Sequence, residues 1–133
     1  MKLIDVYSTD SAVNMLFDLL KERRPEESIS HRAMPTWERH RAFVMSAPYL
    51  AWYIVEVRDG PVGACYLSLQ GEIGVSIFKD SRGQGYGSAA VVELMRLHPG
   101  RFLANINPAN EASIALFRKL GFGGPIQITL EKP

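Results

Sequence analysis

Apolar residues change their spacing along the chain, and each spacing predicts a different element. Residues 11–22 carry apolar side chains three and four positions apart, which predicts an amphipathic helix, at Val13, Leu16, Phe17 and Leu20. Before this helix, the polar residues 8–10 (Ser, Thr, Asp) supply oxygens that can cap it, and KLIDVY predicts a short strand. A second, shorter helix is predicted from about Thr36 through WERHRAFVM, ending before Pro48.

The middle of the chain is rich in strand-forming residues. Two apolar runs, AWYIVEVRDG and PVGACYLSLQ, meet at residues 58–61 (RDGP), which is typical of a hairpin. EIGVSIF, residues 72–78, follows them and predicts a third antiparallel strand. The sequence therefore predicts a meander of three strands at the centre of the fold.

Helical spacing returns in the last third of the chain. A helix is predicted from Gly85 to Leu97, then a strand in RFLANI (101–106), then a helix that Asn110 begins and Gly121 ends. GFGGPIQITLEK, residues 121–132, predicts a last strand. This order predicts an α/β fold of the α+β type in a single domain over residues 1–133, with a mixed, mostly antiparallel sheet flanked by helices.

Composition and charge narrow the function classes. The 133 residues, 47% hydrophobic and 22% charged, are typical of a soluble globular domain. A net charge of +1 provides no general attraction to nucleic acid or to an anionic membrane surface. The single Cys65 favours a buried thiol in a reducing compartment, and the N-terminus has no apolar signal segment, so we expect a cytoplasmic protein. One cysteine and three dispersed histidines offer no metal-ligand spacing.

The stretch RGQGYGS, residues 82–88, is the strongest candidate for a binding site. Its glycines alternate, so it matches neither the dinucleotide-binding pattern G-x-G-x-x-G nor the P-loop, which requires Gly-Lys-Ser/Thr. It joins a predicted strand to the N-terminus of a predicted helix, where unpaired amides and the helix dipole attract anions. A pyrophosphate is the guest that this arrangement favours, and a glycine-rich structural turn is the alternative interpretation.

Two segments resemble the GCN5-related N-acetyltransferases, the GNAT family. Arg82-Gly83-Gln84-Gly85-Tyr86-Gly87 matches every fixed position of the family's acetyl-CoA signature, Arg/Gln-x-x-Gly-x-Gly/Ala. NPANEASIALFRKLGF, residues 107–122, resembles the family's C-terminal motif, an Asn-capped helix that closes with Gly-Phe. One predicted helix and one predicted strand separate the two segments, as in the family.

The resemblance implies a site for acetyl-CoA. The amides from Arg82 to Ser88 would hold its pyrophosphate, while EIGVSIF and RFLANI would splay apart around its pantetheine arm. A backbone amide near Ser76 or Ile77 would polarise the thioester carbonyl. Asn110 matches the family asparagine that contacts the cofactor, with a helix N-cap as its other role. The expected cofactor-binding residues are Val75, Ile77, Arg82, Gly83, Gln84, Gly85, Tyr86, Gly87, Ser88, Asn110 and Phe117.

The acid and base that the family uses are not at their common positions. A tyrosine seven residues after the helix asparagine often protonates the leaving thiolate, but Phe117 stands there and cannot donate a proton. The thiol would leave without an acid, or another tyrosine such as Tyr66 would supply the proton. Members that acetylate ribosomal proteins carry a Glu where this chain has Asn105. Glu72 is the candidate base, directly or through water, and a solvated turn carboxylate is the alternative interpretation.

The segment from Ile29 to Tyr53 is expected to form the acceptor side of the cleft. We expect substrate contacts from His31, Arg32, Trp37 and Trp52, with His31 as an alternative base. His40 is interpreted as a structural residue of the second helix. A loop with His, Arg and aromatic residues suits a phosphorylated or nucleotide-linked amine.

The predicted function is therefore an acetyl-CoA-dependent N-acetyltransferase that acts on a primary amine. A small-molecule or nucleotide-linked acceptor is favoured over a protein, and the resemblance also allows a homodimer. The alternative is a non-catalytic acyl-CoA-binding sensor or accessory module, which Phe117 and Asn105 keep open. No partner of nucleic acid or membrane is expected.

Overall fold

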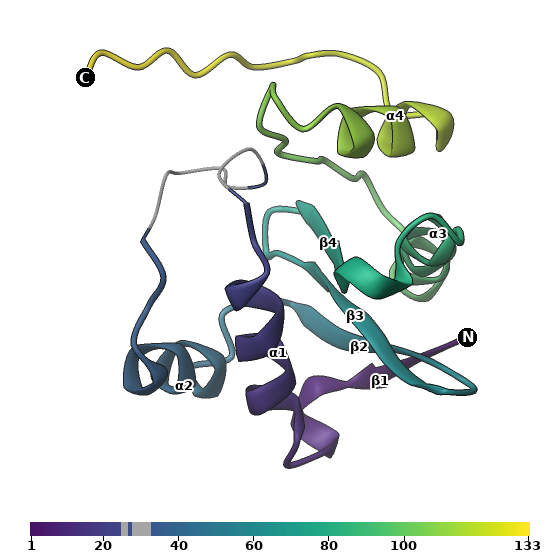
Figure 1. The fold of residues 1–133 in the computed structure, drawn as a ribbon. Coiled ribbons are helices and arrows are strands. Elements are labelled where there is room, and N and C mark those ends of the chain that lie inside the picture. The colour runs from purple at the N-terminus through teal and green to yellow at the C-terminus, as the bar shows by residue number, and fades with distance from the viewer. Residues whose placement is uncertain (25–26, 28–32) are drawn as a thin grey trace.

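The computed structural model describes residues 1–24, 27 and 33–133, and its centre is a four-stranded antiparallel sheet (Figure 1). The strands lie side by side in chain order, as β1 (Lys2–Asp5), β2 (Ala51–Val57), β3 (Gly60–Leu67) and β4 (Ile73–Ile77). The hairpin predicted at residues 58–61 is confirmed, because β2 ends at Val57 and β3 begins at Gly60. A β-bulge interrupts the β2–β3 register between Val55 and Glu56.

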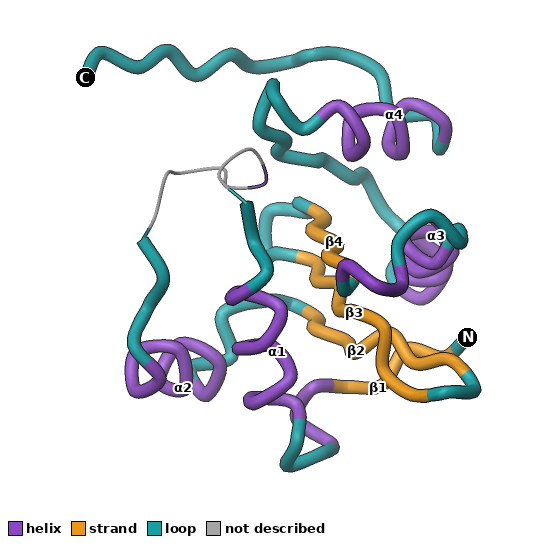
Figure 2. Tube along the Cα trace, in the orientation of Figure 1, coloured by secondary structure: helices purple, strands orange, loops and turns teal. Residues whose placement is uncertain are grey.

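Helices cover both faces of this sheet, as predicted. α1 (Ala12–Lys21) and α2 (Trp37–Met45) lie on one face, while α3 (Tyr86–Leu97) lies on the other, with α4 (Glu111–Lys119) next to α3 (Figures 1 and 2). Two 3₁₀ turns, η1 (Val6–Ser8) and η3 (Lys79–Ser81), follow β1 and β4. The α+β fold class is confirmed.

Alternation along the strands divides the core into two layers. Successive strand residues point to opposite faces, so Ile54 and Ala64 pack toward α1 and α2 while Val55 and Cys65 pack toward α3 and α4. The first layer is completed by Val6, Ala12, Leu16, Leu19 and Val44. The second is completed by Val62, Leu67, Ile73, Ala90, Val91, Leu94 and Phe117.

Most of the predicted helix ends are confirmed. Thr36 caps α2 by accepting a hydrogen bond from the amide of Arg39, and Gly121 follows α4 with φ 97°. The predicted bounds of α1 agree with the structure to within one residue, but the expected capping by residues 8–10 was wrong, because Ser11 is the N-cap and makes no side-chain capping bond. The residues Thr9 and Ser11 instead bond each other through their hydroxyls at 3.1 Å.

The strand predicted over RFLANI is reduced to a single parallel bridge, between Glu72 and Leu103. The amide of Ile73 donates to the Leu103 carbonyl at 2.8 Å, and the Leu103 amide donates to the Gly71 carbonyl at 2.9 Å. Beyond this point the segment 104–110 leaves β4 and leads to α4 (Figure 1). The expected splay between the two segments therefore begins immediately after the bridge.

The last predicted strand does not form. Residues 122–133 have no regular secondary structure and extend past α4, as the yellow end of the ribbon in Figure 1 shows. Apolar residues alternate in this segment, but Ile126, Ile128 and Leu130 are 71%, 75% and 90% exposed. The prediction was wrong because β-propensity reflects packing against a neighbouring strand, and this segment has none within the described chain. Among the described residues, no helix is long and apolar enough to cross a membrane.

Candidate active site

The glycine-rich stretch leads from the end of β4 into α3. Gly83 and Gly85 adopt the left-handed conformation, with φ 79° and 84°, which glycine reaches without steric cost. A Cβ atom on either glycine would have no heavy atom within 4 Å, so the backbone here is open to an approaching group. Gly85 is the N-cap of α3 and provides no side-chain cap. The first amides of α3 therefore have no partner within the helix and face an open, exposed loop.

Arg82 is held by groups that the sequence did not indicate. Its Nε donates to the Ile77 carbonyl at 3.0 Å, and its two terminal nitrogens lie 3.4 Å from the carboxylate of Glu27. Its backbone amide bonds the Lys79 carbonyl at 3.4 Å. Arg82 thus ties the loop to the end of β4 and to Glu27, a contact across 55 residues that no sequence spacing predicts.

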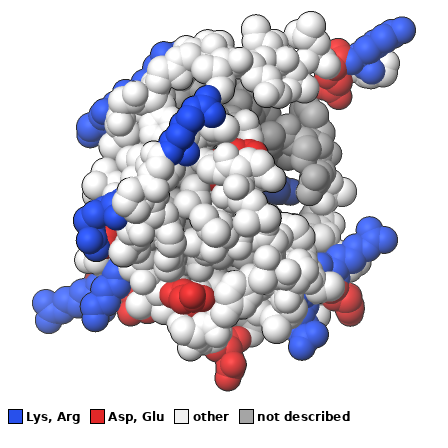
Figure 3. Space-filling view, turned by 180° about the vertical axis from the view of Figure 1, so that it is seen from behind, with Lys and Arg blue, Asp and Glu red and all other residues white. Residues whose placement is uncertain are grey.

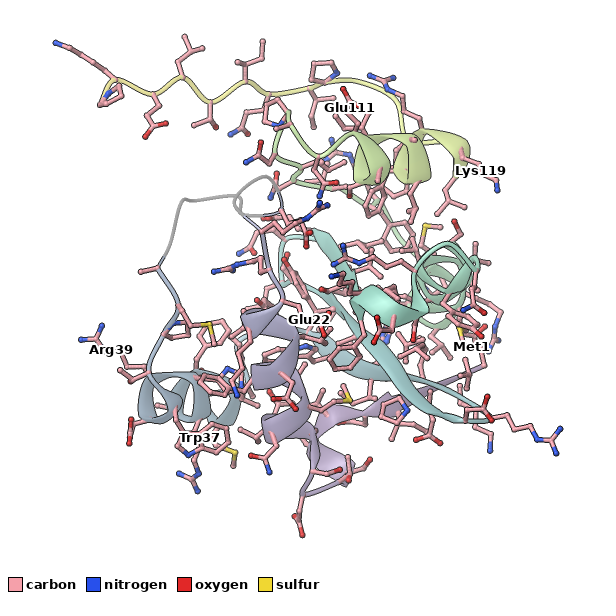
Figure 4. The ribbon with its side chains drawn as sticks, viewed as in Figure 1. Met1, Glu22, Trp37, Arg39, Glu111 and Lys119 are labelled. Atoms are coloured by element: carbon pink, nitrogen blue, oxygen red, sulfur yellow. The ribbon has the colours of Figure 1, made fainter. Side chains whose placement is uncertain are left out.

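Two further contacts support the same loop. The amide of Lys79 donates to Glu22 at 2.7 Å, so the residue that follows α1 anchors η3 (Glu22 is labelled in Figure 4). On the other side, a Cβ on Gly87 would lie 3.1 Å from Leu116, so this glycine lets α3 pack closely on α4. Tyr86 packs its ring against the core and donates its hydroxyl to Gln84 at 3.3 Å.

The edge of β4 beyond the bridge carries backbone groups that face the splay. Because the Ile73 amide bonds Leu103, the amides two and four residues later, of Val75 and Ile77, point to the same side of the strand. The amide of Ser76 points the opposite way, toward β3. The Ile77 carbonyl already accepts the Arg82 side chain. Val75 and Ile77 therefore offer amides on the side where the two segments part.

Glu72 and Asn105 meet where the splay begins. The side-chain amide of Asn105 donates to one carboxylate oxygen of Glu72, and the Glu72 backbone amide bonds the Ser68 hydroxyl at 2.9 Å. Glu72 is half-buried, and Ser68 is 9% exposed. Sequence reasoning identified both Glu72 and Asn105 as separate positions but not their contact. The only available signal was a polar residue within the predicted strand 101–106 and another at the start of the predicted strand 72–78.

Tyr66 lies on the same face of the sheet as Glu72, over β4. It is the register partner of Gly74, and its ring stacks on Tyr49 at 4.0 Å with an interplanar angle of 6°. Burial raises the pKa of Tyr66, the charge of Glu72 raises it further, and a hydrogen bond with Tyr49 lowers it. Gly74 interrupts no register between β3 and β4, so it is a packing glycine under Tyr66 and not a bulge.

The aromatic residues of the expected acceptor side form two groups. Trp52 and Phe43 extend the Tyr49–Tyr66 stack, with Trp52 edge-on to Tyr49 at 4.8 Å. Trp37, labelled in Figure 4, belongs to a second group, in which it packs edge-on against Phe17 of α1 at 5.3 Å and contacts the ring of His40. His31 and Arg32 lie outside the described residues.

The remaining histidine of this region is structural, as interpreted from the sequence. His40 is 3% exposed, its Nε2 lies 2.8 Å from the Val13 carbonyl, and its ring contacts Phe17. The hydrogen bond joins α2 to α1 and satisfies a buried polar group. His40 therefore contributes to packing between the two helices.

Asn110 and Phe117 have clear structural roles on α4. The side-chain oxygen of Asn110 accepts the Ser113 amide at 3.1 Å, which confirms the predicted N-cap. Phe117 is 3% exposed and packs edge-on against Phe122 at 5.0 Å. Little of the Phe117 ring is left for a ligand to touch, and a cofactor contact by either residue stays a prediction.

Charged side chains are distributed around the molecule. On the face seen in Figure 3, Lys and Arg side chains lie mainly near the rim, with Asp and Glu among them, and they form no continuous basic area on this face. At the glycine-rich loop, the groups available to an anion are the backbone amides, the α3 dipole and the neighbouring Arg82.

Comparisons with known proteins identify the family. A family model described as an acetyltransferase (GNAT) domain matches residues 5–123. The chain belongs to the GNAT acetyltransferase family. It is 35% identical over 82 residues to the peptidyl-lysine N-acetyltransferase YjaB of Escherichia coli K12, a match that covers 62% of this chain and 54% of that relative. The matched part thus spans about half the length of the curated relative.

Solved structures agree with the GNAT assignment at the level of the fold. The ribosomal-protein-alanine N-acetyltransferase of Brucella melitensis has a TM-score of 0.68 and 19% identity, covering 91% of this chain and 83% of that one. The phosphinothricin acetyltransferase of Sinorhizobium meliloti, in complex with acetyl-CoA, has a TM-score of 0.67 and 21% identity, covering 90% and 73%. The family resemblance inferred from RGQGYG and the C-terminal motif is confirmed.

Proposed function

We propose that this GNAT domain is an acetyl-CoA-dependent N-acetyltransferase that acts on a primary amine. The observation that carries this proposal is the splay after the Glu72–Leu103 bridge, which leads along β4 to the open glycine loop before α3. It forms one path lined by backbone amides, suited to a long molecule with an anionic end. Two similar structures, from Sinorhizobium meliloti and Salmonella typhimurium, are complexes with acetyl-CoA.

The donor would be held mainly by backbone groups. The amides of residues 83–88, namely Gly83, Gln84, Gly85, Tyr86, Gly87 and Ser88, would bind the pyrophosphate at the N-terminus of α3. Arg82 would fix the loop and contribute charge. The amides of Val75 and Ile77 would bind the pantetheine arm as an added strand would. Asn110 would contact the same molecule from the start of α4, in addition to capping that helix.

Glu72 is the proposed general base. Its carboxylate is half-buried at the start of the splay, and Asn105 engages one oxygen, which fixes the orientation of the other. Glu72 takes the proton of the attacking amine, directly or through one water. The Ser76 amide points toward β3, and the Ile77 amide lies five residues beyond Glu72 along the strand. The Val75 amide faces the splay closer to Glu72, so it is the proposed donor to the thioester carbonyl oxygen.

The proposed acceptor is a small-molecule primary amine. Glu72 and Tyr66 are half-buried beside Tyr49 and Trp52, which suits a slender alkyl arm lying against aromatic rings. A lysine side chain is the second candidate, favoured by the 35% identity to a peptidyl-lysine N-acetyltransferase. It presents the same primary amine on an alkyl arm. The nucleotide-linked amine that His31 and Arg32 suggest depends on residues outside the described part of the chain.

The test is release of free thiol from acetyl-CoA with a panel of amines, followed by mass spectrometry of the acceptor. The panel contains linear diamines, amino sugars, nucleotide-linked amines and lysine-bearing peptides, with acetyl-CoA alone as the blank for hydrolysis. Acetylated amine above the blank supports the proposal. Thermal stabilisation by acetyl-CoA without acetylation of any amine would favour the alternative, a binding module that only senses acyl-CoA.

A further inference from the structure

Tyr66 reaches across β4 because Gly74 has no side chain. The two residues are partners in the β3–β4 register. A Cβ atom on Gly74 would overlap ring carbons Cε1 and Cζ of Tyr66 and lie 2.6 Å from its hydroxyl oxygen. The phenol therefore occupies the space above the backbone of β4, where any other residue at position 74 would exclude it. Its hydroxyl lies over β4, and the edge of β4 that does not pair with β3 borders the splay.

The ring is held in this place by its neighbours. Tyr49 stacks on it at 4.0 Å, almost parallel, and Trp52 supports Tyr49 edge-on at 4.8 Å. A hydrogen bond with Tyr49 also reaches the Tyr66 side chain. A stacked and hydrogen-bonded phenol loses rotational freedom, so its hydroxyl stays directed over β4.

Tyr66 keeps its proton in this environment. Burial is the main cause that raises its pKa above the ordinary value of 10.0, and the nearby charge of Glu72 is the second. The Glu72 side chain projects from the same face as Gly74, two residues away, because strand residues alternate. The candidate base and a protonated phenol are therefore neighbours at the start of the splay, whereas Phe117 is buried in the core on the opposite face.

We propose that Tyr66 is the acid that protonates the departing thiolate, and that Glu72 returns a proton to it after each turnover. This proposal rests on the proposed acetyltransferase function. The proton would then come from a tyrosine of β3, because Phe117 of α4 has no hydroxyl to donate.

The protons and electrons of this step balance. The amine nitrogen forms a bond to the acetyl carbon, the bond from that carbon to sulfur breaks, and its electron pair stays on sulfur. Glu72 takes a proton from the amine nitrogen, while the Tyr66 hydroxyl gives its proton to sulfur. The products are an amide and a free thiol. The Glu72 carboxyl group then passes its proton to the Tyr66 phenolate, which restores both residues.

The test is Tyr66→Phe, which removes only the hydroxyl and keeps the stack on Tyr49. With acetyl-CoA and the best amine of the panel, we expect kcat to fall by about 10²-fold or more. With an acetyl thioester of an aromatic thiol, whose thiolate leaves without a proton, kcat/KM of the variant should equal that of the wild type. The matched control is Tyr53→Phe on β2, whose hydroxyl is paired with His98 at 2.7 Å on the opposite face. The kinetic parameters of this control with both acetyl donors should equal those of the wild type.

Gly74→Ala provides a second variant if Tyr66→Phe does not fold. It keeps the hydroxyl but displaces the ring, and it should lower the rate with acetyl-CoA more than the rate with the aromatic thioester. Equal losses for both donors would overturn the proposal and make Tyr66 a packing residue. An unchanged kcat with acetyl-CoA would overturn it too, while leaving the proposed function intact. Failure of the wild type to acetylate any amine would instead overturn both the proposed function and the role of Tyr66.

Discussion

Glu72 is positioned in the proposed site by contacts with two separate segments, the turn after β3 and residues 103–105. Its amide bonds Ser68, its carboxylate accepts Asn105, and its backbone pairs with Leu103. A carboxylate held in this way needs no reorganisation when it receives a proton, which is what preorganised catalytic groups require. At the scale of the residue, the proposed chemistry therefore depends on orientation more than on composition.

Replacing Glu72 with Gln should lower kcat by about 10²-fold or more, because the amide cannot accept the amine proton. The KM for acetyl-CoA should change little, since the proposed contacts with its pantetheine arm come from backbone amides of β4 and not from the Glu72 side chain. Steady-state kinetics checks both values. Glu93→Gln on α3, whose carboxylate pairs with Arg96 at 2.6 Å, is the matched control and should keep full activity. Full activity of Glu72→Gln would exclude Glu72 as the base.

Phe117→Tyr should not restore a missing acid. The ring is 3% exposed and in contact with Phe122, so an added hydroxyl would be buried without a partner. We expect a loss of about 1–3 kcal/mol in the free energy of unfolding, measured in urea, and no gain in kcat. Phe43→Tyr, on a ring that is 44% exposed, is the control for stability. Faster turnover of Phe117→Tyr would instead show that the hydroxyl reaches the reaction.

The buried thiol of Cys65 makes the folded protein less stable at high pH. Burial raises the pKa of its thiol from 9.0 to about 12. The unfolded chain then loses this proton at lower pH than the folded chain, so stability is complete below pH 9 and falls as the pH rises toward 12. The contribution is about 1.4 kcal/mol per pH unit in that window. Urea unfolding at pH 9 and pH 11 should show a steeper loss for the wild type than for Cys65→Ala, and equal slopes would contradict this.

At the scale of the elements, the proposed donor site lies between the edge of β4 and the N-terminus of α3. β4 pairs with β3 along its whole length but with the segment at Leu103 only once, which leaves the Val75 and Ile77 amides facing the splay. The loop then turns through Gly83 and Gly85 into α3. Arg82 holds that loop against the end of β4, and Glu22 holds the preceding 3₁₀ turn near α1. Gly87 lets the start of α3 pack closely on Leu116 of α4.

Gly85→Glu should abolish stabilisation by acetyl-CoA. The new side chain would enter the open space before α3 and place a negative charge where we propose the pyrophosphate. At 100 times its dissociation constant, acetyl-CoA should stabilise the wild type by about 2.7 kcal/mol and the variant not at all, measured by thermal unfolding. Gly60→Glu in the β2–β3 hairpin is the matched control, because Gly60 also has a positive φ (127°) and open surroundings. Stabilisation of Gly85→Glu equal to that of the control would contradict the assignment.

At the scale of the whole molecule, two core layers enclose the sheet, while the C-terminal segment lies outside both. Ile126, Ile128 and Leu130 are the most exposed apolar residues after position 97, although their alternation is that of a strand. The guanidinium of Arg118 donates to the Gly124 carbonyl at 3.3 Å, which ties the start of this segment to α4.

Removing residues 126–133 should change the free energy of unfolding by no more than about 0.5 kcal/mol, because exposed residues contribute little to stability. Urea unfolding of the full and shortened chains measures this. Analytical ultracentrifugation should give the same oligomeric state for both chains. A larger loss of stability would show that the segment pairs with a strand in solution, and a loss of dimer would place that strand in a second copy.

Local pattern alone was sufficient for much of the fold. The spacing of apolar residues placed α1, α2, β2, β3 and α3 within a few residues, because these elements bury one face and their periodicity records it. The caps Thr36 and Asn110 were also predictable, since each bonds an amide three residues later. The same reasoning failed for residues 101–106 and 121–132, whose strand formation depends on a partner and not on their own composition.

The sequence by itself determined the family and the glycine-rich loop, because these depend on short segments in which spacing is enough. The donor site that it places at this loop remains a prediction. Only the tertiary structure decided how the chemistry is assembled. Glu72 meets Asn105 across 33 residues, Arg82 meets Glu27 across 55, and Tyr66 covers Gly74 from the neighbouring strand. Such contacts come from packing of distant segments, whose geometry no local pattern records. The sequence could name Tyr66 as a candidate acid, but only the folded chain shows that its ring lies over Gly74 of β4.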